Sequence, residues 1–157
     1  MKLKKLFGKI LGAGLCMGML LGCMPGGALQ VKAATEPNYL TFTAEEAGST
    51  LSLSWASASD VQTSTDHGTT WSAYARGTTI TLANVGDSVS FKGRGFVANN
   101  SANVNHVKIT GKIAASGSVT SLIDENGGDP NVTLPNDCFA HMFQDCTSLT
   151  QAPELPA

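Results

Sequence analysis

The sequence predicts a mainly β fold, a small antiparallel β-sandwich that is followed by one solenoid-type repeat. Three observations predict it. Between residues 39 and 123, apolar residues alternate with polar ones, which is the period of a half-buried strand. Turn-forming residues interrupt this alternation at intervals of roughly 8–12 residues, as in a sandwich. After Pro135, the spacing of the apolar residues changes from two to three or four.

Residues 1–33 are predicted to be a signal peptide. Four lysines precede an uncharged apolar run, and the segment ends in the small-residue motif Val31-Lys32-Ala33. The run of about a dozen residues is short for a membrane span, which needs roughly 20. Two cleavage sites stay open: an ordinary cut before Ala34, and a cut at a motif resembling a bacterial lipobox, Leu20-Leu21-Gly22-Cys23. A secreted or extracellular cell-surface protein is expected, with a membrane contact only if Cys23 is lipidated.

Cleavage before Ala34 changes the charge and the cysteine content. The whole chain has 10 basic and 12 acidic residues, and cleavage leaves five basic and twelve acidic ones, a net charge of −7. Nucleic acid is therefore not an expected partner, because its binding requires clustered Lys and Arg. Only Cys138 and Cys146 remain, so no disulfide framework is expected, although a disulfide between these two stays open.

Residues 34–123, which we call the β-module, contain the expected strands. No helix is expected between residues 39 and 123. Residues 124–135 are rich in Gly, Pro, Asn and Asp and are predicted to be a linker. The acidic residues of the linker do not have the spacing of a calcium loop. The alternating apolar positions that define the strands are Leu40/Phe42/Ala44, Leu51/Leu53/Trp55, Ile80/Leu82, Val89/Phe91 and Val107/Ile109.

Residues 136–157, the repeat segment, are predicted to form a short helix and then an extended stretch. Asn136 or Asp137 can cap the helix. A short helix followed by an extended stretch is the unit of a leucine-rich-type solenoid, and one such repeat cannot bury its own apolar face. We therefore expect an incomplete first repeat from a longer reading frame. The residues expected to face water in part are Phe139, Met142, Phe143, Leu149 and Leu155.

Residues 138–157 also carry a resemblance. Their run M-F-x-x-C-T-S-L-T-x-A-P-E-L-P-A resembles one repeat of the BspA-like leucine-rich-repeat surface proteins of bacteria. Residues 61–66, 68–71 and 91–93 are similar to the N-terminal domain of such proteins. The resemblance implies a secreted or cell-surface protein whose stacked repeats bind a partner, and some members are adhesins toward host matrix proteins or other bacteria. It supplies no catalytic residue, and this chain departs from the family in having about one repeat.

Residues 64–71 fit the pattern S-x-D-x-G-x-T-W, which resembles the Asp-box of sialidases and other propellers. The pattern predicts a β-hairpin turn in which the Asp carboxylate accepts hydrogen bonds from its own turn. A glycan-binding loop with contacts from Trp71 and Tyr74 is the alternative.

No catalytic, cofactor-binding or metal site is predicted. No serine lies in a G-x-S-x-G elbow. Asp60, Asp66 and Asp87 lie at expected turns rather than as a catalytic pair. The three histidines lack the short, paired spacing of zinc ligands.

The predicted function is therefore non-enzymatic. We expect an exported binding or adhesion protein whose partner is a host or bacterial surface protein or a glycan. Recognition is expected mainly in repeats beyond this sequence. The alternative is a carbohydrate-binding module of a glycan-active surface protein, which depends on how far Trp55 and Trp71 are exposed.

Overall fold

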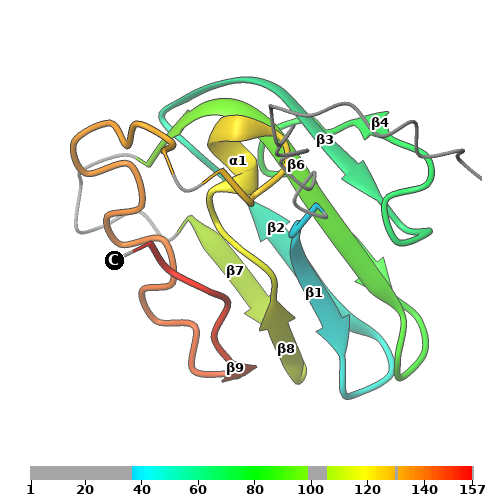
Figure 1. Ribbon diagram of the computed structural model, residues 1–157. Helices are drawn as coiled ribbons and strands as arrows, with labels where there is room; N and C mark the ends of the chain where they lie inside the picture. Colours follow the sequence, from blue (N-terminus) through cyan, green and yellow to red (C-terminus); the bar gives the residue numbers. More distant parts are fainter. Residues whose placement is uncertain (1–36, 99–105, 130, 157) are drawn as a thin grey trace, which may run out of the picture. The chain divides into compact units, whose positions relative to one another are not determined.

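The structure, a computed structural model, describes residues 37–98, 106–129 and 131–156. These residues form two β-sheets and one short helix (Figure 1). The elements are β1 (Leu40–Ala44), β2 (Ser49–Leu53), β3 (Ser57–Ser64), β4 (Ser72–Ala73), β5 (Ile80–Leu82), β6 (Ser88–Val97), β7 (Val107–Thr110), β8 (Ile113–Ser116), α1 (Ser121–Asp124) and β9 (Leu149–Gln151).

The larger sheet has the strand order β4-β3-β6-β1-β8-β9, and the smaller one has the order β5-β2-β7. The strands pair in antiparallel fashion except β8 and β9, which are parallel. This confirms the prediction of a mainly β protein with two antiparallel-rich sheets, as in a β-sandwich.

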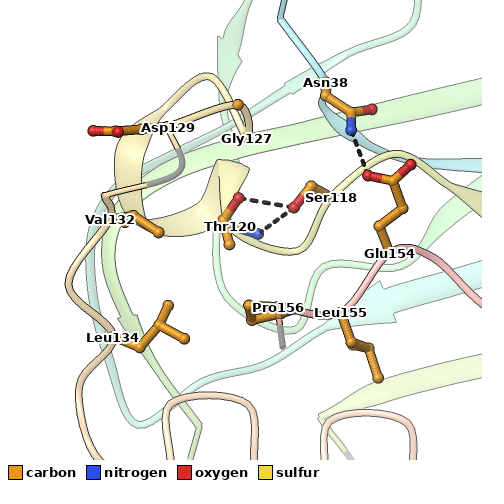
Figure 2. Close-up of a pocket in the computed structure, with 11 residues that line it drawn as sticks. Asn38, Ser118, Thr120, Gly127, Asp129, Val132, Leu134, Glu154, Leu155 and Pro156 are labelled. Carbon is orange, nitrogen blue, oxygen red and sulfur yellow. Dashed lines mark hydrogen bonds between the residues drawn. The ribbon is translucent and has the colours of Figure 1, made fainter.

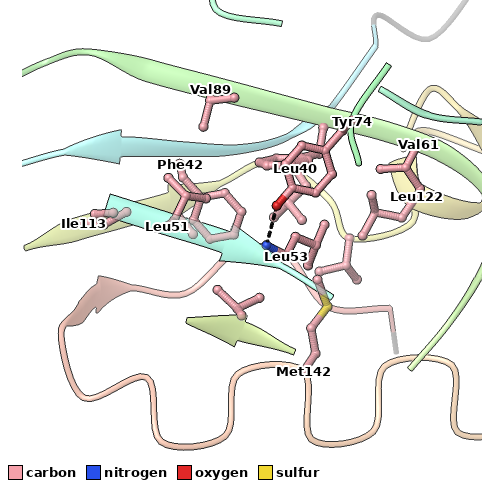
Figure 3. Packing of buried hydrophobic residues seen from close by; sticks show 14 of the residues in the cluster. Leu40, Phe42, Leu51, Leu53, Val61, Tyr74, Val89, Ile113, Leu122 and Met142 are labelled. Carbon is pink, nitrogen blue, oxygen red and sulfur yellow. Dashed lines mark hydrogen bonds between the residues drawn. The ribbon is translucent and has the colours of Figure 1, made fainter. Parts of the chain in front are cut away.

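The hydrophobic core draws side chains from both sheets (Figure 3). In β1, Leu40, Phe42 and Ala44 are buried, while the intervening threonines are half-buried on the opposite face. Phe42 meets Phe91 of β6 edge to face, with ring centroids 5.9 Å apart. The strict alternation in β1 therefore fixes which face of the larger sheet contacts the core.

The expectation that residues 39–123 contain no helix is wrong, because α1 begins at Ser121. Its sequence signal is weak, since the helix has only four residues. Tertiary contacts hold it in place. The Ser121 hydroxyl accepts a hydrogen bond from the backbone N–H of Leu40 at 3.0 Å and donates one to the carbonyl of Phe91 at 2.9 Å. Leu122 is fully buried in the core.

The helix predicted to start at Asn136 or Asp137 is also absent, and consecutive turns take its place. Asp137, His141 and Asp145 have φ values of +55°, +55° and +59°. Such left-handed residues at every fourth position are incompatible with an α-helix, and Asp and His are among the residue types that tolerate this conformation. The apolar side therefore repeats every four residues, with Cys138 and Met142 buried and Cys146 half-buried.

The predicted linker packs in the same compact unit as the β-module and the repeat segment. The carboxylate of Asp124 accepts backbone N–H bonds from Asn126, Gly127 and Asp129, at 2.9, 2.5 and 3.2 Å. The carbonyl of Asn126 accepts a further bond from the backbone N–H of Asn38, at 2.6 Å. Within the described ranges, no helix reaches the length and hydrophobicity that a membrane crossing requires.

Candidate functional site

The repeat segment is joined to the β-module through the backbone of β8 and the residues after it. The N–H of Ile113 donates to the carbonyl of Ser148 at 3.3 Å. Further along the chain, the backbone N–H of Glu154 donates to the carbonyl of Gly117 at 2.7 Å. The backbone carbonyl of Glu154 accepts a bond from the N–H of Val119 at 3.2 Å. Between these bonds, β9 pairs in parallel with β8, with Leu149 opposite Ile113, and is the outer strand of the larger sheet (Figure 1).

Apolar side chains of the repeat segment fill the end of the core. Met142 is 1% exposed, and it points into the cluster in Figure 3. Phe139 stacks on Phe96, with ring centroids 6.0 Å apart and planes at 21°. The expectation that Met142 would face water is wrong, because the core of the β-module covers it. Phe139, Phe143 and Leu149 are partly buried, and Leu155 remains 60% exposed.

A groove of about 520 Å³ lies next to Leu155 (Figure 2). Its apolar part includes Leu155 and Leu134, which are 60% and 36% exposed and are two of the three large apolar residues exposed in the described chain. Its polar part contains the Asn38 amide, which donates to the Glu154 carboxylate at 2.8 Å. The groove thus places exposed apolar surface at Leu134 and at residues 154–156, which follow β9 in the chain.

The predicted hairpin turn at residues 64–71 is confirmed, since it joins the antiparallel strands β3 and β4. Asp66 accepts bonds from the Thr70 hydroxyl at 2.6 Å, the Thr70 N–H at 2.8 Å and the Ser64 hydroxyl at 2.7 Å. These three bonds, in that order of importance, lower the pKa of Asp66 to about 2. The carboxylate therefore organises its own turn.

Trp71, a predicted ligand contact, is half-buried beside this turn. Its indole N–H donates to the carbonyl of Gly68 at 3.0 Å. The ring of Tyr39 meets it edge-on at 4.8 Å, and the Lys92 ammonium lies 4.5 Å from its ring centroid. Neighbouring side chains therefore already occupy part of the indole surface, and contact with a ligand stays a prediction.

Tyr74, the second predicted contact, is 8% exposed. Its hydroxyl accepts a bond from the N–H of Leu53 at 2.8 Å and donates one to the carbonyl of Thr78 at 2.6 Å. Burial raises the pKa of this phenol. Trp55, which is half-buried, packs against the Tyr74 ring with centroids 6.0 Å apart. Tyr74 thus offers a ligand little surface.

The cysteines Cys138 and Cys146 are free thiols. Burial raises the pKa of both, and the Cys146 thiol donates to the carbonyl of Val107 at 3.2 Å. Cys23, the predicted lipidation site, lies outside the described residues. Within the described ranges, no group of three His, Cys, Asp or Glu side chains is arranged to hold a metal ion.

Two smaller hollows, which no local sequence pattern predicts, adjoin His67 at the hairpin turn. One, of about 260 Å³, includes Thr41, Ser90 and Ser116. The other, of about 350 Å³, includes Asp87. The polar positions of the strands were visible in the sequence, but only the pairing of β1 with β6 and β8 brings the three hydroxyl residues together.

No family model matches the chain, and no curated protein or solved structure matches it either.

Proposed function

We propose that this chain belongs to an exported, non-enzymatic cell-surface binding or adhesion protein. In this proposal the β-module is the N-terminal cap of a leucine-rich solenoid. Recognition lies mainly in further repeats, and the partner is a host or bacterial surface protein or a glycan. The observation that supports it most is the position of β9, which pairs in parallel with β8 and is the outermost strand of its sheet.

Two physical points connect β9 with this function. The outer edge of a strand has backbone groups that a further parallel strand can pair with. Leu155, close to β9 in the chain, is 60% exposed, which suits packing against a following repeat. At the other side, the β-module already covers Met142 and part of Phe139, as a cap would.

Export can be tested by intact-mass analysis of the protein recovered from cells that express the full gene. A mature chain beginning at Ala34 supports ordinary secretion, and a diacylated chain beginning at Cys23 supports a lipoprotein. An uncleaved chain found only in the cytoplasm would contradict the proposal.

Binding can be tested with the exported protein on immobilised fibronectin, laminin and collagen, and on whole bacterial cells. We expect saturable binding to at least one of them. Leu155→Glu should weaken it several-fold, because the charge disturbs packing at the repeat edge. Val85→Glu is the matched control, since Val85 is also an exposed apolar residue, 66% exposed, but lies outside the repeat segment. If Leu155→Glu and Val85→Glu bound equally well, the exposed apolar surface at Leu155 would have no role in binding.

The second candidate function is that of a carbohydrate-binding module of a glycan-active surface protein. The observation that favours it is the pair of polar hollows beside His67. If the exported protein bound no glycan on an array, this candidate would be rejected, and the proposal of a binding or adhesion protein would be unaffected.

A further inference from the structure

We propose that the two hollows beside His67 are adjacent subsites for a neutral oligosaccharide, with His67 shared between them. The inference rests on the second candidate function and assigns it to residues other than Trp71 and Tyr74. It is independent of binding through the repeats.

The first hollow has a floor of hydroxyl groups on the face of the larger sheet opposite the core. Thr41 of β1 is paired directly with Ser90 of β6 and Ser116 of β8, so the three side chains lie in one row across neighbouring strands. The Thr41 and Ser90 hydroxyls are 2.8 Å apart, and Thr41 donates to the carbonyl of Tyr39 at 3.0 Å. Ser90 is then the donor to Thr41, and its oxygen keeps acceptor capacity.

Several polar groups around this floor have no hydrogen-bond partner among the described residues. They are the Ser116 hydroxyl, the Tyr39 phenol and the His67 imidazole, and His67 is exposed at the turn. Hydroxyl and imidazole groups can both donate and accept, as sugar hydroxyls do. The hollow therefore presents donors and acceptors to a ligand rather than an apolar lining.

The hairpin holds His67 in a fixed backbone position between the hollows. Its φ is +57°, in the left-handed region that few residues adopt and that is often found at ligand sites. The Thr70 N–H and hydroxyl donate to the Asp66 carboxylate, and the Gly68 N–H donates to the Ser64 hydroxyl at 2.8 Å, so hydrogen bonds hold the turn on both sides of His67. The imidazole is thus presented by a rigid turn.

The second hollow is also polar and has few charges. Asp87 is the only acidic residue among those that line it, and one of its oxygens accepts the Asn84 N–H at 2.9 Å. Neither hollow contains a lysine or arginine. A neutral ligand therefore fits better than a phosphate or a sulfated sugar, which would need cationic partners. The volumes are small: about 350 Å³ lies at the lower end of the range for small-molecule sites, roughly 300–1,000 Å³, and about 260 Å³ lies below it, so each hollow suits a single sugar ring.

The test starts with an array of neutral glycans, followed by titration of the ¹⁵N-labelled exported protein with the di- or trisaccharide that binds best. We expect saturable amide shifts at Thr41, His67, Ser90 and Ser116. His67→Asn should weaken binding at least tenfold, and Asn tolerates the left-handed backbone. His141→Asn is the matched control, because His141 is likewise exposed and has a φ of +55°.

A second pair of variants tests the floor of the first hollow. Ser116→Val should weaken binding, whereas Ser59→Val, at another exposed strand serine, should not. Glycan binding with shifts confined to the Trp71 indole, and unchanged in His67→Asn, would overturn this inference but keep the second candidate function. An array without any binding to neutral glycans would overturn both.

Discussion

The carboxylate of Asp66 accepts hydrogen bonds from both the backbone N–H and the hydroxyl of Thr70, at 2.8 and 2.6 Å. These two bonds close the turn between β3 and β4, in which Asp66 directly precedes His67. The turn therefore depends on the charge of one exposed carboxylate, which makes its contribution to stability dependent on pH.

Asp66→Asn should lower the melting temperature at pH 7 by a few degrees, because the amide cannot accept all the bonds that the carboxylate accepts. The folded pKa of Asp66, about 2, is below its ordinary value of 3.8. Its stabilising contribution is therefore present above pH 4 and is lost as the pH falls toward 2. Melting curves measured from pH 7 to pH 2 should converge for the two proteins. Asp145→Asn, at an exposed carboxyl with a φ of +59°, is the control at pH 7 and should leave the melting temperature nearly unchanged.

Tyr74→Phe should destabilise the fold by about 1–3 kcal/mol, because the buried Leu53 N–H loses its partner. The pKa of Tyr74 is raised above 10.0 in the folded state, so its contribution is complete below pH 10 and is lost as the pH rises further. Urea denaturation at pH 7 and at pH 10.5 measures both effects. Tyr39→Phe is the control, and we expect a change within about 0.5 kcal/mol. Equal losses of stability in Tyr74→Phe and Tyr39→Phe would contradict the role of the Tyr74 hydroxyl as the partner of the Leu53 N–H.

Local patterns predicted those elements that depend on local chemistry. Strict alternation predicted β1, and the spacing of Ser64, Asp66 and Thr70 predicted the hairpin turn. In the repeat segment, the helix prediction is wrong because of residues with a left-handed backbone conformation. The apolar spacing of Phe139, Met142 and Phe143 is that of a helix, but Asp137, His141 and Asp145 adopt positive φ and produce turns instead.

The candidate site was less predictable than the fold, because it depends on strand pairing between distant segments. Thr41, Ser90 and Ser116 are ordinary polar positions in three separate strands, and they become one row only through the register of β1 with its two neighbours. Tyr74 shows that the burial of a single side chain was also not predictable from the sequence. An aromatic residue next to a turn can be read as exposed, yet its hydroxyl bonds two backbone groups and the ring is buried.

Gly117→Ala should be more damaging than Gly86→Ala, although both glycines have positive φ, +70° and +89°. At Gly86 a methyl group would meet nothing within 4 Å, so only left-handed strain remains, about 1–2 kcal/mol. At Gly117 it would collide with the carbonyl of Tyr39. We expect a further loss of about 1–3 kcal/mol, measured by chemical denaturation. Similar losses would mean that β1 can move away from the Gly117 turn without cost.

Met142→Ala should destabilise the whole chain by about 2–5 kcal/mol, because the side chain is 1% exposed and its loss leaves a cavity. Met142 belongs to the repeat segment, whereas the core around it belongs mostly to the β-module, so the two should unfold in a single transition. Urea denaturation followed by both tryptophan fluorescence and far-UV circular dichroism checks this, since Trp55 and Trp71 lie only in the β-module. Leu155→Ala, at 60% exposure, is the control and should change stability by less than about 0.5 kcal/mol. If Met142→Ala left the fluorescence transition unchanged, the β-module would fold independently of the repeat segment. Packing against the repeat segment would then contribute nothing to the stability of the β-module.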